Sequence, residues 1–161
     1  MTRKDLNPML RLAALNIGVH VTGINALKEV SLPVGSSDDV SMGLLERHVK
    51  SSLSFWIYKN TNSENHNKIL TFIQMQNGIL KSNGLNFISR YATLNDAPIL
   101  ANIFISDNDP MVQYGCIHNF CTIFDEHIMT MEAFMKDKDK IIIQWKSLLL
   151  SKGFIKLDSN K

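Results

Sequence analysis

The spacing of apolar residues is the feature of this sequence that most restricts its fold. Along residues 40–57, apolar side chains recur three and four positions apart, with charged side chains such as Glu46 and Lys50 between them. Residues at this spacing lie on one face of an α-helix, so the pattern predicts a helix that buries one stripe and exposes the other. The pattern returns along the chain, and no alternation of strands with helices is visible. We therefore expect an all-α fold.

Six to eight helices, joined by short polar loops, are expected to form a compact bundle. The first would cover about residues 8–20, with a short strand at Val19–Thr22 as the alternative. The last contains Ile141–Ile143 and Leu148–Leu150, which place apolar side chains around most of its circumference. We expect this largely apolar C-terminal helix to lie at the centre of the bundle. Further helices are expected over residues 40–57, 69–83, 97–105, 110–124, 129–135 and 137–152.

Capping residues predict where several of these helices begin and end. Asp109 followed by Pro110 is typical of an N-cap with proline in the first helical position. Gly84 and Gly153 are expected to end their helices as C′ residues, where glycine adopts the left-handed conformation at little cost. These boundaries leave only short connections between helices.

One domain over residues 1–161 is expected, because 161 residues with 45% hydrophobic and 20% charged side chains suit one sizeable core. The terminal stretches 1–7 and 156–161 are expected to be flexible tails. No stretch approaches the ~20 apolar residues that a membrane-crossing helix needs, so we expect no membrane association.

The two cysteines indicate a reducing compartment. Cys116 and Cys121 are five residues apart in one predicted helix, so their side chains point about 140° apart and cannot easily be bridged. A chain without a disulfide framework fits the reducing interior of the cell, and we expect it to be cytoplasmic.

The segment Cys116-x-His118-x-x-Cys121, followed by Asp125 and His127, contains the residue types that bind zinc. On a helix, however, Cys116 does not share the face of His118 and Cys121. An apolar stripe also raises the pKa of a thiol, which works against a cysteine nucleophile. We therefore favour a structural role for this segment and expect no metal ion.

No other group of residues predicts catalysis. Asp107 and Asp109, like Asp38 and Asp39, directly precede a predicted helix, where aspartate is a favoured capping residue. No Lys-Ser or Lys-Thr follows the glycines near residue 20, so a phosphate-binding loop is not predicted. We expect neither enzymatic activity nor a cofactor.

Basic residues near aromatic ones suggest a nucleic-acid surface. The net charge of +2 is small for a dedicated nucleic-acid-binding protein, but it permits an anionic partner. Phe55, Trp56 and Tyr58 follow the nearest basic residues closely and could serve as stacking platforms for bases. The residues expected to line such a surface are Arg11, Arg47, Lys50 and Arg90.

The sequence thus favours a non-enzymatic helical interaction and assembly domain that acts through protein–protein contacts, with a homo-oligomer as the expected state. A helix that is apolar all round needs either a central place in the core or a partner. Methionine-rich segments suit adaptable contacts. The expected interface residues are Ile143, Leu150, Met131 and Met135. The alternative is a subunit associated with RNA or another single-stranded nucleic acid, such as a viral nucleocapsid or coat-type protein.

Overall fold

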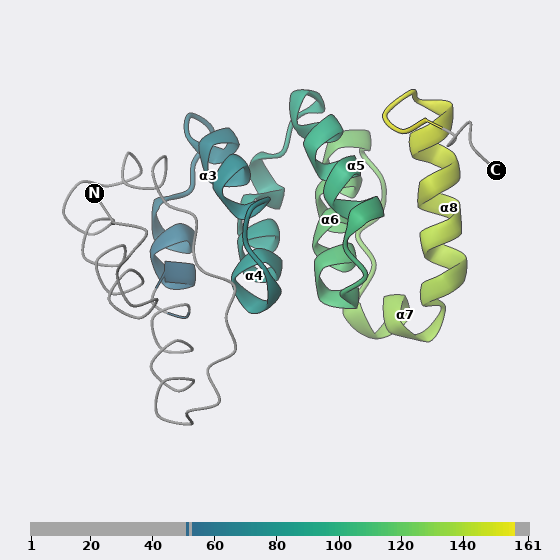
Figure 1. Cartoon of the computed structure of the whole chain (residues 1–161), viewed down its shortest axis with the longest axis horizontal. Coiled ribbons are helices and arrows are strands. Elements are labelled where there is room, and N and C mark those ends of the chain that lie inside the picture. Colours follow the sequence, from purple (N-terminus) through teal and green to yellow (C-terminus); the bar gives the residue numbers. More distant parts are fainter. Residues whose placement is uncertain (1–50, 52, 157–161) are drawn as a thin grey trace, which may run out of the picture. The chain divides into compact units, whose positions relative to one another are not determined.

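The computed structural model describes residues 51 and 53–156, and these residues contain helices and no β-strand. The prediction of an all-α fold is confirmed (Figure 1). The predicted helix at residues 8–20, its alternative strand and the tail at 1–7 lie outside the described residues. After a helix that includes residues 53–60, the elements are α3 (His66–Ile73), α4 (Gly78–Ile88), η2 (Ser89–Tyr91), η3 (Leu94–Asp96), α5 (Ala97–Ser106), α6 (Pro110–Phe124), α7 (Met131–Lys136) and α8 (Lys138–Ser151).

The chain divides into two compact units, residues 1–88 and residues 89–161. The expectation of a single domain over the whole chain stays a prediction. Within the described part, no helix is both long enough and apolar enough to cross a membrane.

In the first unit, the helix at 53–60 buries Leu53, Trp56 and Ile57, and α3 packs against α4. Gly84 lies inside α4, where a Cβ atom would come 2.5 Å from Ile73 Cδ1. The prediction that Gly84 ends a helix is therefore wrong, because this glycine instead lets α4 approach α3 closely. The fully buried side chains here include Leu53, Ile57, Ile69, Leu70, Phe72, Ile73, Leu80 and Leu85.

In the second unit, α6 has more buried residues than α5, α7 or α8, and it contacts α5, η2 and α7. It begins as predicted: the Asp109 carboxylate accepts a hydrogen bond of 2.8 Å from the Met111 backbone N–H, and Pro110 takes the first helical position. Phe120 of α6 meets Phe104 of α5 edge-on, with ring centroids 5.8 Å apart. Aromatic packing thus holds these two helices together.

The C-terminal helix α8 ends as predicted. Gly153 has φ +78°, and the Phe154 N–H bonds to the Leu149 carbonyl at 2.9 Å, which closes the helix in a Schellman motif. Its central placement is not confirmed, because only Trp145 and Leu149 of α8 are buried. Trp145 stacks on Phe120 at 5.5 Å, so α8 packs through one stripe and not around its circumference.

Candidate functional site

The Cys–His segment of α6 is part of the core. Cys116 is fully buried, and the Cys121 thiol donates a hydrogen bond to the His127 carbonyl at 3.5 Å. Burial, with the nearby Glu126 carboxylate, raises the pKa of the Cys121 thiol to about 11. A thiol whose pKa is raised in this way forms little thiolate at neutral pH and is a weak nucleophile.

His118 packs against an aromatic ring one turn earlier. Its imidazole stacks on the Tyr114 ring with centroids 5.7 Å apart, and burial lowers its pKa. The Tyr114 hydroxyl donates a hydrogen bond of 2.9 Å to the Met129 carbonyl, which ties the segment after α6 back to that helix. Among the residues that the structure describes, no three His, Cys, Asp or Glu side chains are placed to hold a metal ion.

The four predicted interface residues lie on the consecutive helices α7 and α8. Ile143 is 67% exposed and Met135 is 51% exposed, whereas Met131 and Leu150 are half-buried. Counting 100° per residue, Ile143 and Leu150 lie on the side of α8 that faces away from the buried Trp145. We call this side, defined by Ile143 and Leu150, the outer face of α8.

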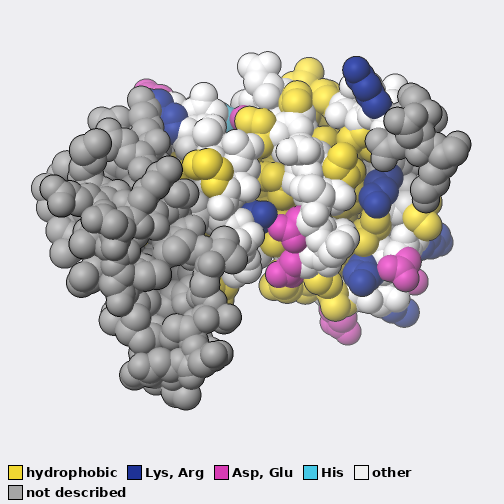
Figure 2. All heavy atoms as spheres, viewed as in Figure 1, with side chains coloured by type: hydrophobic (Ala, Val, Ile, Leu, Met, Phe, Trp, Pro, Cys, Tyr) yellow, Lys and Arg dark blue, Asp and Glu magenta, His cyan; other side chains and the backbone are white. Residues whose placement is uncertain are grey.

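Acidic and basic residues occupy different segments of the second unit, a separation that the overall composition does not reveal. Residues 91–135 contain no Lys or Arg, and their acidic residues are Asp96, Asp107, Asp109, Asp125, Glu126 and Glu132. Residues 136–156 contain two acidic residues, Asp137 and Asp139, and the basic residues Lys136, Lys138, Lys140, Lys146, Lys152 and Lys156. Figure 2 shows lysine side chains gathered over α8. One part of this unit is therefore acidic, and its last helix is basic.

Of the four residues predicted to bind nucleic acid, the structure describes Arg90. It is exposed, and its guanidinium lies over the Tyr91 ring, 5.1 Å from the centroid. Arg11, Arg47 and Lys50 lie outside the described residues. The predicted basic groove therefore stays a prediction.

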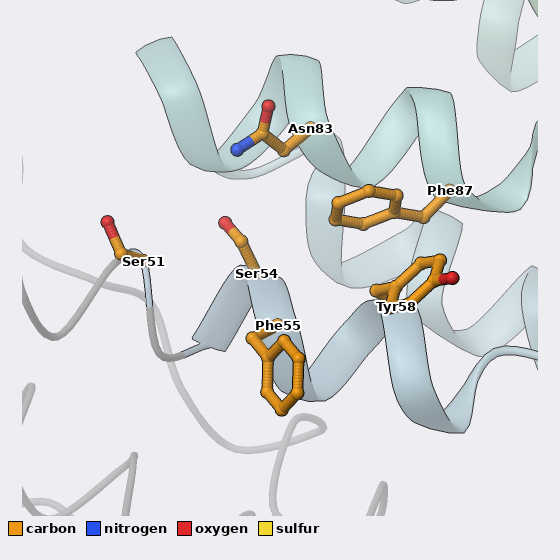
Figure 3. A pocket seen from close by; sticks show the side chains of 6 residues that line it. All are labelled: Ser51, Ser54, Phe55, Tyr58, Asn83 and Phe87. Carbon is orange, nitrogen blue, oxygen red and sulfur yellow. The ribbon is translucent and has the colours of Figure 1, made fainter.

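A pocket in the first unit brings aromatic residues from two helices together (Figure 3). Its volume is about 320 Å³, at the lower end of the range for small-ligand sites. Phe55 and Tyr58 are 60% and 43% exposed, whereas Trp56 between them is in the core. We call this site the aromatic pocket; its lining residues are Ser51, Ser54, Phe55, Tyr58, Asn83 and Phe87.

Sequence analysis named Phe55, Trp56 and Tyr58 as stacking platforms; this is wrong for Trp56, which is buried in the core, and the pocket itself was missed. The other side of the pocket is formed by Asn83 and Phe87 of α4. The Phe87 ring lies beside the Tyr58 ring, and their centroids are 5.2 Å apart. The local signal was available, since Phe55 and Tyr58 are three residues apart on one helix face. The partner helix is a tertiary contact that spacing along the chain does not reveal.

Comparison with known proteins gives no match, whether with protein-family models, with curated proteins or with solved structures. The functional interpretation therefore depends on the geometry and charge of this chain itself.

Proposed function

We propose that this chain is a non-enzymatic assembly domain that self-associates through the outer face of α8. The observation that carries the proposal is the 67% exposure of Ile143 on α8, away from the buried Trp145. Single exposed apolar residues are ordinary on protein surfaces. Here, however, Leu150 lies on the same side one heptad later, and exposed Met135 precedes them on α7.

The charges around the outer face support a second copy of the chain as the partner. Lys140 and Lys146 lie on either side of the Ile143–Leu150 line. Acidic residues of the 91–135 stretch stand next to exposed apolar side chains, as at the corner between α5 and α6, where Ile105 and Met111 are about half exposed. Two surfaces of opposite charge, each with apolar residues, are complementary between copies.

This complementarity favours a head-to-tail contact over a symmetric one. A symmetric antiparallel pair of α8 helices that matched Ile143 to Leu150 would place Lys146 beside its own copy on the twofold axis. Like charges at that position repel each other, whereas a head-to-tail contact places Lys146 against acidic residues. Head-to-tail contacts generate rings or open filaments, which suits an assembly role.

The test is light scattering on the full chain after a charge is introduced into the outer face. Ile143→Asp should weaken self-association at least about tenfold, because a buried interface residue would become a desolvated carboxylate. The matched control is Ile79→Asp on α4, because Ile79 is 52% exposed and lies in the other unit. Equal effects of the two substitutions would contradict the proposal.

A second substitution separates the two geometries. Lys146→Gln should weaken a head-to-tail contact and strengthen a symmetric α8 pair, since it removes an attraction in the first and a repulsion in the second. Self-association that strengthens would exclude the head-to-tail arrangement.

We keep association with a single-stranded nucleic acid as a second candidate function, because a separate observation favours it. Lys59 Nζ lies 5.5 Å from the centroid of the exposed Phe55 ring and 5.7 Å from that of Tyr58. Stacking surfaces beside a cation are the features by which proteins hold unpaired bases. Filter binding of the full chain to a single-stranded RNA should weaken as salt rises, and no binding at low salt would remove this candidate.

A further inference from the structure

The aromatic pocket contains exposed aromatic rings that do not contribute to the hydrophobic core. Leu53, Trp56 and Ile57 already bury the inner stripe of the 53–60 helix. Phe55 and Tyr58 lie on the opposite side, and covering their rings would remove apolar surface from water. Binding of a ligand with a flat apolar face to this pocket is therefore favourable.

The pocket is not purely apolar, which restricts the ligand further. Figure 3 shows the Asn83 amide and the Ser51 and Ser54 side chains among the residues that line it. An amide can both donate and accept hydrogen bonds, as the edge of a nucleobase requires. An aliphatic ligand could not make hydrogen bonds with the Asn83 amide.

The charge beside the pocket is positive. Lys59 holds its ammonium over the Phe55 and Tyr58 rings, so a group that binds at these rings would have a cation close by. The charged residues of the described part of this unit are Lys59, Lys68, Lys81 and Glu64. A ligand that joins an aromatic ring to an anionic group fits this arrangement better than a neutral one.

We propose that the aromatic pocket binds an unpaired base of a single-stranded nucleic acid, with Phe55 and Tyr58 as the stacking surface and Lys59 on the adjacent phosphate. This inference rests on the second candidate function above and is independent of self-association through α8. Phe87 closes the pocket from α4, and Asn83 contacts the edge of the base. Recognition by stacking tolerates different bases, so the site serves to hold a strand without reading its sequence.

The test measures fluorescence anisotropy of a fluorescein-labelled oligouridine of about twelve nucleotides, within the site sizes common for single-stranded binding, titrated with the full chain. Phe55→Ala should weaken binding at least about fivefold, the lower range for loss of one stacking ring. Phe55→Trp keeps an aromatic face and should retain binding. The control is Met75→Ala, since Met75 is 49% exposed in the same unit but does not line the pocket.

The salt dependence tests the role of Lys59. Lys59→Gln should reduce the slope of log affinity against log salt by about 0.7, the value for one phosphate contact on a single strand. Lys68→Gln removes an exposed lysine that is not placed over these rings and should leave the slope unchanged. Free uridine monophosphate should compete only at far higher concentration, because it offers one base and lacks the strand.

The outcomes distinguish whether the pocket proposal alone is wrong or whether nucleic-acid binding itself is wrong. If the wild-type chain binds oligouridine and Phe55→Ala binds equally well, the pocket is not the site, although nucleic-acid binding stands. If the wild-type chain does not bind at low salt, both fall, and a protein side chain becomes the alternative occupant. Circular dichroism of each variant must match the wild type, and Phe55→Trp provides a folded comparison if Phe55→Ala does not fold.

Discussion

The helices α6 and α8 are almost equally long and both rich in apolar residues, yet they occupy opposite kinds of position. In α6, buried residues extend around most of the helix and include polar Gln113 and Asn119. In α8, Trp145 and Leu149 alone are buried, and Ile143 faces solvent. No Lys, Arg, Asp or Glu occurs in α6, whereas α8 contains four such residues, and α8 is the more exposed of the two helices. Apolar content indicates a need for contacts, but it does not say whether the contacts come from the same chain.

The largest difference between α6 and α8 should appear in the free energy of unfolding when a large side chain is truncated in each helix. Phe120→Ala in α6 should lower the free energy of unfolding by about 3–5 kcal/mol, because a buried ring that packs on Phe104 and Trp145 leaves a cavity. Ile143→Ala on the outer face of α8 should change it by less than about 0.5 kcal/mol in the dissociated chain. Urea unfolding followed by circular dichroism measures both, and similar losses would show that α8 is as buried as α6.

A cysteine in α6 and a cysteine in α8 should differ about a hundredfold in the fraction of thiolate that each forms at pH 8. The pKa of Cys121 is raised from 9.0 to about 11, so at pH 8 its thiolate fraction is about a hundredfold lower than that of an ordinary thiol. Its alkylation rate should therefore keep rising with pH towards 11. A cysteine introduced on α8 by Ser147→Cys, at an exposed position, should level off about two pH units earlier. Iodoacetamide labelling read by peptide mass spectrometry gives both profiles, and coinciding profiles would contradict the burial of Cys121.

A smaller effect distinguishes how the two helices begin. Asp109 accepts a hydrogen bond from the Met111 N–H, whereas Asp137, at the N-cap of α8, makes no side-chain capping bond. Asp109→Ala should lower the free energy of unfolding by about 1 kcal/mol, and Asp137→Ala should change it much less. Thermal unfolding resolves this difference, and the reverse order would mean that the capping geometry is not maintained in solution.

Local chemistry made much of the fold predictable. The start of α6 at Asp109–Pro110 and the end of α8 at Gly153 follow from which backbone conformations and hydrogen bonds these residues support. All-α architecture follows from the spacing of apolar residues. These signals act within a few residues along the chain, so they can be read without the tertiary structure.

The features that the sequence did not predict depend on contacts between segments that are distant in sequence. Gly84 carries the same local signal whether it ends a helix or admits Ile73 of a neighbouring helix, and only the packing of α3 on α4 decides. The aromatic pocket needed Phe87 from α4 to join Tyr58. The predicted interface residues were named from apolar excess, but the division into an acidic stretch and a basic helix went unnoticed because total charge averages over it.

Sedimentation equilibrium of the unmodified chain, over a range of protein and salt concentrations, tests most directly whether the outer face of α8 meets a second copy. We expect an average mass above the 18.2 kDa of one chain, rising with protein concentration and falling with salt as the acidic and basic surfaces are screened. A mass of 18.2 kDa at every concentration and at the lowest salt would contradict self-association and leave the outer face of α8 without the partner we propose.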